Sequence, residues 1–80
     1  MAFVIQDIDN QKYLKHTGNH EEDHPYYDVN SPDKAEKFST FDHVSYVAFW
    51  YCDMFRNWRI IDLETNNIYV KEGRKFVLEG

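Results

Sequence analysis

The chain has 80 residues, enough for one domain, which we place at residues 1–80. A chain of this size buries only about 60% of the surface that its unfolded form exposes. Fourteen acids against nine bases give a formal net charge of −5, and such a field repels nucleic acid and anionic membranes. Cys52 is the only cysteine, so an internal disulfide and a cysteine-based zinc site are both excluded.

The sequence also lacks recognisable membrane and export segments. Its longest apolar run, Val47–Cys52, is far shorter than the roughly 18 residues that span a bilayer. The first residues carry no basic region, and an acid follows at Asp7, so we expect no signal peptide. A cytoplasmic location is the expectation that follows.

Two short extended segments begin the chain. Ala2–Ile8 has apolar residues on both alternating faces, which is typical of a central strand. Lys12–Lys15 resumes an extended pattern after a turn at residues 9–11, so we expect a hairpin. Residues 16–32 contain glycine, prolines and asparagine and read as a long loop, with a short extended piece at Tyr26–Val29.

The middle of the chain is helical in pattern. Asp33–Phe38 predicts one helical turn with Ala35 and Phe38 directed inward, and Ser39 or Thr40 would then cap a longer helix from about Phe41 to about Phe55. The expected core stripe consists of Phe41, Val44, Ala48, Tyr51 or Cys52, and Phe55. Further rings lie outside this stripe, so the helix is more apolar than one face on a small sheet can hide.

The last third of the chain predicts three more strands: 58–63, 68–70 and a short one at 76–78. No internal repeat is visible. Together these elements predict an α+β fold with the order ββαββ, in which one main helix packs on one face of an antiparallel sheet of four to five strands.

The negative charge is concentrated in one segment. Residues 1–20 and 43–80 are each neutral in sum, whereas residues 21–42 hold seven acids against two lysines. Carboxylates in such a segment can occupy sites on a partner that phosphates normally fill. The acidic residues that we expect to bind a partner are Glu21, Glu22, Asp23, Asp28, Asp33, Glu36 and Asp42.

The aromatic helix offers the second part of a binding surface. Aromatic residues dominate the energetics of protein interfaces, and we select Tyr46, Phe49 and Trp50 as candidate anchors. The alternatives for these two parts are that every ring belongs to the core and that the acids only keep the protein in solution.

Three histidines four residues apart, His16, His20 and His24, suggest a metal site for zinc, nickel or copper, of which zinc is the possible cofactor. The His24–Pro25 step argues against a helix that would align them, so a solvated polar loop is the alternative. Histidines near carboxylates titrate close to neutral pH. Acidification would therefore reduce the negative charge of this segment and release a partner bound to it.

We expect no enzymatic activity. His43 and Cys52 are nine residues apart on one helix, about 13 Å along its axis, which is too far for a nucleophile and its base. No phosphate-binding glycine motif and no zinc-protease motif occurs. Direct binding of nucleic acid is also disfavoured, because acids offset the late basic residues.

Several short motifs carry a family resemblance: Phe3-Val4-Ile5-Gln6, Lys12-Tyr13-Leu14, residues 34–42 with an Ala-x-x-Phe turn, and Trp58-Arg59-Ile60-Ile61. In this arrangement of hairpin, turn, helix and strand, the chain resembles small uncharacterised proteins encoded by phages and prophages of Gram-positive bacteria. The resemblance implies a protein that acts in the host cytoplasm by stoichiometric binding to a host or defence protein.

Three hypotheses follow. The first is an acidic, phage-type protein that inhibits or redirects a nuclease or another protein that handles nucleic acid, as a DNA mimic with an anti-defence (anti-CRISPR-like) role. The second is a metal-binding or pH-responsive module built on the three histidines. The third is a homodimer whose aromatic helix face is its own interface.

Overall fold

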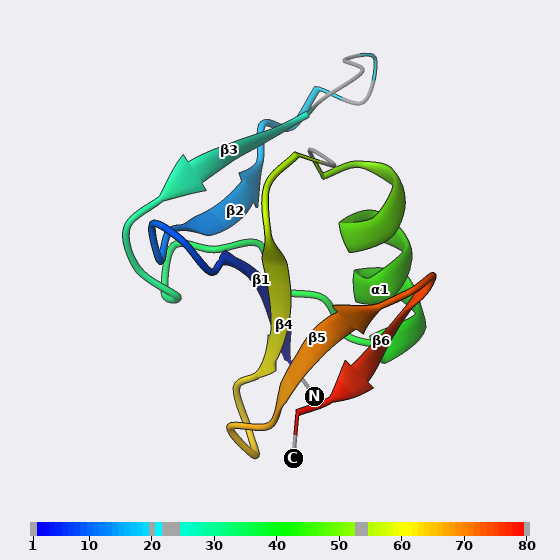
Figure 1. The fold of residues 1–80 in the computed structure, drawn as a ribbon. Coiled ribbons are helices and arrows are strands. Elements are labelled where there is room, and N and C mark those ends of the chain that lie inside the picture. Colours follow the sequence, from blue (N-terminus) through cyan, green and yellow to red (C-terminus); the bar gives the residue numbers. More distant parts are fainter. Residues whose placement is uncertain (1, 20, 22–24, 53–54, 80) are drawn as a thin grey trace.

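The structure is a computed structural model, which describes residues 2–19, 21, 25–52 and 55–79. It contains one antiparallel sheet and one helix, α1 (Phe41–Trp50), which covers one face of the sheet (Figure 1). The strands are β1 (Phe3–Asp7), β2 (Tyr13–His16), β3 (Tyr26–Val29), β4 (Trp58–Asp62), β5 (Ile68–Glu72) and β6 (Lys75–Leu78). The predicted α+β class is confirmed.

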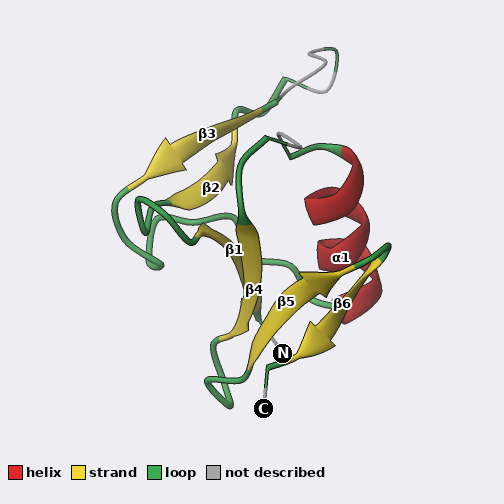
Figure 2. Cartoon of the chain, viewed as in Figure 1, coloured by secondary structure: helices red, strands yellow, loops and turns green. Residues whose placement is uncertain are grey.

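The sheet has six strands rather than the four or five expected. The additional strand is β3, because residues 26–29 pair with β2 along their whole length instead of forming an extended piece within a loop. The strand order is β3-β2-β1-β4-β5-β6. The sheet therefore consists of two three-stranded meanders joined along β1 and β4, with α1 in the connection between them (Figure 2).

The seam between β1 and β4 is symmetric about its centre. Three cross-strand pairs on the core face show it: Ile5 with Ile60 at the centre, Phe3 with Asp62 on one side, and Asp7 with Trp58 on the other. An aromatic ring thus lies opposite a buried aspartate at both ends. The sequence did not indicate this symmetry, because the halves share geometry and few side chains.

The two central hairpin turns, after Asp7 and after Asp62, have the same construction. Each aspartate carboxylate accepts a hydrogen bond from the N–H two residues further on, at 2.8 and 2.9 Å. Each aspartate carbonyl accepts another from the N–H four residues further on, at 2.8 Å in both turns. The donors of this second bond, Gln11 and Asn66, have φ angles of 60° and 62°. The two buried aspartates therefore stabilise these turns through hydrogen bonds.

Residues 31–38 fill the gap where β1 and β2 diverge. Ala35 and Phe38 are directed inward as predicted, since both side chains are buried. Phe38 exchanges two backbone hydrogen bonds with Phe3, and the Glu36 N–H donates to the Leu14 carbonyl. This segment thus connects the two strands beyond the point where they pair directly.

The helix begins as predicted and ends earlier. The Thr40 hydroxyl accepts a hydrogen bond from the His43 N–H as the N-cap. The expected end near Phe55 is wrong, because α1 ends at Trp50 with Tyr51 as its C-cap. Its fully buried residues are Val44, Val47 and Ala48. Beyond them the chain must leave the helix to reach the start of β4.

The core lies between α1, the segment at Phe38 and one face of the sheet. Its buried members are Phe3, Ile5, Leu14, Phe38, Val44, Val47, Ala48, Trp58, Ile60 and Phe76. The expected core position of Phe55 is wrong, since its side chain is 90% exposed. No helix among the described residues is long and apolar enough to span a membrane.

The matched turns generate a stability prediction. An ordinary side chain in the left-handed region costs about 1 kcal/mol, whereas asparagine and glycine tolerate this conformation. We expect Gln11→Gly to raise the free energy of unfolding by about 0.5–1 kcal/mol, and Asn66→Gly to change it little. Urea denaturation measures both. A destabilised Gln11→Gly variant would contradict this account of the turn. The control is Gln11→Ala, which removes the side chain but keeps the cost of a positive φ.

Candidate binding surface

Four large rings are exposed together around the C-terminal end of α1, and we call them the aromatic cluster: Tyr46, Trp50, Tyr51 and Phe55. The ring centroid of Tyr46 lies 6.4 Å from that of Trp50 and 6.0 Å from that of Tyr51. Phe55 borders the same surface depression as Trp50 and Tyr51. With Trp50 66% and Phe55 90% exposed, the cluster presents contiguous apolar surface of the kind that marks interaction sites.

Phe49 supports this cluster from below. Its side chain is half-buried, and its ring lies edge-on to Trp50 with the centroids 5.1 Å apart. The Lys71 ammonium lies 5.1 Å from the centroid of the Phe49 ring, on the side of β5. Of the three predicted anchors, Tyr46 and Trp50 are therefore accessible to a partner, and Phe49 holds Trp50 in place.

Two members of the cluster were not predicted as binding residues. The three- and four-residue spacing placed Phe55 and either Tyr51 or Cys52 in the core stripe. Of the last two, Cys52 is the one that packs against the core. That stripe required a helix continuing to Phe55. Because α1 ends at Trp50, the spacing no longer describes one face, and both rings lie at the surface.

An open groove of about 790 Å³ lies between α1 and β6. One helix face forms its first wall, and the opposite wall consists of Lys75 and Phe76 from β6 together with Arg74 from the turn before it. Neither of these two basic side chains has an ion-pair partner among the residues that the structure describes. The groove thus combines apolar walls with charges of both signs, since Asp42 also lines it.

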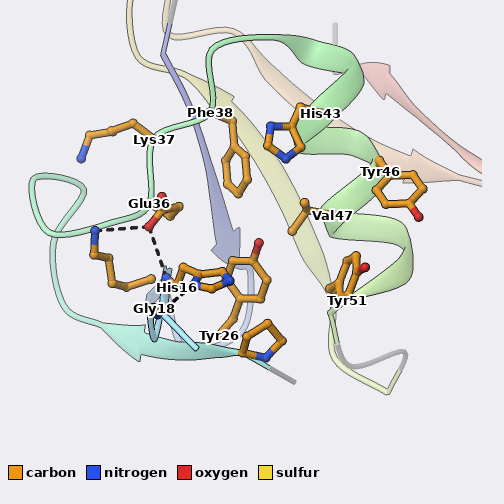
Figure 3. A pocket seen from close by; sticks show the side chains of 12 residues that line it. His16, Gly18, Tyr26, Glu36, Lys37, Phe38, His43, Tyr46, Val47 and Tyr51 are labelled. Carbon is orange, nitrogen blue, oxygen red and sulfur yellow. Dashed lines mark hydrogen bonds and ion pairs between the residues drawn. The ribbon is translucent and has the colours of Figure 1, made fainter. Parts of the chain in front are cut away.

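A second pocket, of about 620 Å³, lies between α1, β2 and the segment at Phe38 (Figure 3). The His43 ring packs edge-on against Phe38, with centroids 5.1 Å apart, and His16 packs in the same way against Tyr26 at 5.0 Å. These two histidines therefore line a pocket with an aromatic wall.

The polar rim of this pocket is occupied by internal contacts. Glu36 accepts a hydrogen bond from the His16 N–H at 3.4 Å and lies 3.2 Å from the Lys15 ammonium. The Nδ1 atom of His16 accepts a hydrogen bond from the Gly18 N–H at 2.8 Å. The Glu36 charge is thus used within the fold, and its availability to a partner is reduced.

The thiol of Cys52 lies beneath the aromatic cluster and is not poised for nucleophilic chemistry. Burial raises the pKa of Cys52 to about 12, although the Arg56 guanidinium acts in the opposite direction. Burial also raises the pKa of Tyr26 to about 12, with further contributions from Cys52, Glu36 and Tyr51. Cys52 is accordingly a protonated, packed side chain at neutral pH.

The histidine hypothesis receives no support within the described part of the chain. His20 and His24 lie outside the described residues. His16 borders the pocket of Figure 3, and its Nδ1 is engaged by the local turn. Among the residues that the structure describes, no group of three histidine, cysteine or acidic side chains could hold a metal ion.

The acidic segment does not act as one uniform surface. Glu22 and Asp23 lie outside the described residues. Asp28 is bound by Arg56 through two hydrogen bonds, and Glu36 is bound by Lys15. The segment's exposed acids with no ion pair among the described residues are Glu21, Asp33 and Asp42.

Arg56 joins three elements beneath the aromatic cluster. Its Nε donates to the Asp7 carboxylate at 2.6 Å, its second guanidinium nitrogen donates to Asp28 at 3.0 and 3.1 Å, and its guanidinium carbon lies 4.3 Å from the Trp58 ring centroid. Burial alone would raise the pKa of Asp7, but the hydrogen bonds from Arg56 and two backbone N–H groups outweigh it and lower that pKa. Arg56 was not singled out as a structural residue by the sequence.

Comparison with protein-family models, with curated proteins and with solved structures gives no match for this chain.

The Arg56–Asp7 pair predicts a specific response to acid. Because the folded pKa of Asp7 lies below its ordinary value of 3.8, its contribution to stability is complete above that pH and is lost as pH falls through the folded pKa. Arg56→Gln leaves a buried carboxylate without its ion-pair partner. We expect it to lower the free energy of unfolding by about 2–3 kcal/mol at pH 7.

The same substitution should move acid unfolding to higher pH, since burial then acts on Asp7 without the arginine. Urea unfolding across pH 2–7 (about the range over which carboxylates titrate) measures both effects. The control is Arg59→Gln, which removes a 2.7 Å hydrogen bond to the neutral Gln6 side chain and should leave the acid transition in place. Equal acid transitions for Arg56→Gln and the wild type would contradict the assignment.

The state of Cys52 is checked by its reaction with a thiol reagent. We expect alkylation by iodoacetamide at pH 8 (roughly the pKa of a free thiol) to be at least ten-fold slower in the folded protein than in the urea-unfolded protein. The reason is that burial keeps the folded thiol protonated. Folded and unfolded rates that agree within a factor of about two would show that Cys52 is accessible and ionised.

Proposed function

We propose that this protein is a non-catalytic binding module that recognises another protein through the aromatic cluster. The observation that carries the proposal is the joint exposure of Tyr46, Trp50, Tyr51 and Phe55 on a domain that has already formed a complete core without them. Rings exposed in this way carry a free-energy cost in water that a partner removes.

The cluster has the composition of an interface hot spot. Tryptophan and tyrosine are the residues whose truncation most often weakens a complex. Phe49 fixes Trp50 from below at 5.1 Å, so little side-chain freedom is lost when a partner covers that ring. The rest of the surface around these rings then serves to exclude water from the contact.

The narrower form of the proposal concerns the partner. We propose a host or defence protein that handles nucleic acid, such as a nuclease, which the module inhibits by occupying a basic surface. The exposed carboxylates of Glu21, Asp33 and Asp42 support this form, together with the net charge of −5. Asp28 and Glu36 support it less, because both are compensated inside the fold.

The experiment is capture from a nuclease-treated bacterial lysate on the immobilised protein. We expect one specific partner. Trp50→Ala should weaken binding of that partner by at least ten-fold, about 1.4 kcal/mol, because the substitution removes the exposed ring that anchors the contact. The matched control is Tyr27→Ala. Tyr27 is 49% exposed, but alternation along β3 places it on the sheet face opposite the core.

The partner class is tested with the captured protein in purified form. A DNA duplex should compete for it, and Asp33→Asn with Asp42→Asn should weaken binding and reduce its dependence on salt. Binding that persists unchanged in the double variant and in excess duplex would remove the nucleic-acid form of the proposal. Binding that is insensitive to Trp50→Ala and Phe55→Ala together would remove the proposed function itself.

A further inference from the structure

Strand β6 ends the sheet, and its outer edge is free of strand partners in the described chain. The Glu79 N–H donates to the Ile68 carbonyl at 2.8 Å, which fixes the phase of the ladder between β5 and β6. Hydrogen-bonded pairs alternate in an antiparallel ladder, so residues 75, 77 and 79 bond inward to β5. The N–H and C=O groups of Phe76 and Leu78 are therefore directed outward.

We infer that this edge pairs with β6 of a second copy of the chain, antiparallel and centred on Val77, to form a symmetric dimer with one continuous twelve-stranded sheet. Twofold dimers, in which the same surface patch of both copies meets itself, are the commonest homo-oligomers. The inference rests on the backbone edge of β6 and on residues outside the aromatic cluster, although Tyr46 and Trp50 of that cluster line the groove whose opposite wall holds Lys75 and Phe76.

The register follows from the outward groups. Only Phe76 and Leu78 can form intermolecular backbone bonds, so Phe76 of each copy lies opposite Leu78 of the other, with four N–H to C=O bonds in total. Their side chains fall on the core face, where Leu78 is 53% exposed. Val77 then meets its own copy across the axis.

Charge complementarity supports the second copy as the occupant. In this register Lys75 of each copy lies directly opposite Glu79 of the other, at non-hydrogen-bonded positions, where side chains approach most closely. Both side chains are exposed and have no ion pair among the described residues. The β6 edge is therefore self-complementary, because basic residues face acidic ones and apolar residues face apolar ones across the axis.

The opposite edge of the sheet lacks this property. On β3 the Thr17 N–H donates to the Pro25 carbonyl, so Tyr26 and Asp28 carry the outward backbone groups. If β3 paired with β3 of a second copy, Tyr27 would face Tyr27 of that copy and Tyr26 would face its Asp28. No pair of opposite charges would form. Asp28 is already bound by Arg56. Of the two edges, only β6 is self-complementary.

The first test is the mass in solution. Sedimentation equilibrium at concentrations up to about 1 mM, which detects weak interfaces of this size, should give a mass approaching twice the 9.7 kDa of one chain. Leu78→Pro removes one outward N–H and leaves the bonds to β5 intact, since proline is tolerated on a free strand edge. We expect this variant to be monomeric and to melt as the monomeric wild type does.

The second test reads individual amides. Hydrogen exchange at Phe76 and Leu78 should slow at least ten-fold between dilute and concentrated protein, because these N–H groups bond only in the dimer. The Val77 amide is the internal control, since it bonds to β5 in both states. Equal exchange at both concentrations for Phe76 and Leu78 would overturn the inference.

The third test uses the charge pair. Glu79→Lys and Lys75→Glu should each weaken the dimer at least ten-fold, through two like-charge contacts, while an equimolar mixture of the two variants should dimerise as the wild type does. A wild type that is monomeric at all concentrations would overturn the inference. A dimer insensitive to these changes and abolished by Trp50→Ala would also overturn it, because the aromatic cluster would then be the interface.

Discussion

The structure depends most on the guanidinium of Arg56. It binds the carboxylates of Asp7 and Asp28 and lies over Trp58, so one cation connects the end of β1, the strand β3 and the start of β4. These three places are distant in sequence. Because Asp7 is almost fully buried, its charge needs this partner.

The aromatic cluster exists because the small core is already full. The core takes only three fully buried residues from α1, Val44, Val47 and Ala48, while the segment at Phe38 and the ring of Trp58 occupy the space at either end. Phe41 still packs against this core, whereas the rings of Tyr46 and Trp50 remain exposed. Tyr51 belongs to the same surface because α1 ends at Trp50 instead of continuing to Phe55.

Local patterns predicted the α+β class, the α1 start at Thr40 and five of the strands, because turn residues, caps and alternation act over a few residues. They missed the end of α1 at Trp50, because the apolar spacing continues to Phe55. They also could not show the pair of Arg56 and Asp7, which lie 49 residues apart in sequence. They placed an extended piece at Tyr26–Val29 but did not show that it pairs with β2 as a strand of the sheet. For the candidate site, composition indicated Tyr46 and Trp50, whereas the roles of Asp28 and Glu36 depended on which bases the fold brings beside them.

The seam between β1 and β4 has a consequence for when the protein acquires its structure during synthesis. Phe3 pairs with Asp62, about 60 residues later in the chain, and contacts this distant form slowly. The first meander therefore leaves the ribosome with one side of its central strand unpaired and with Ile5 lacking its partner Ile60. It has to wait for the second meander, so the domain folds as a whole only after β4 has been made.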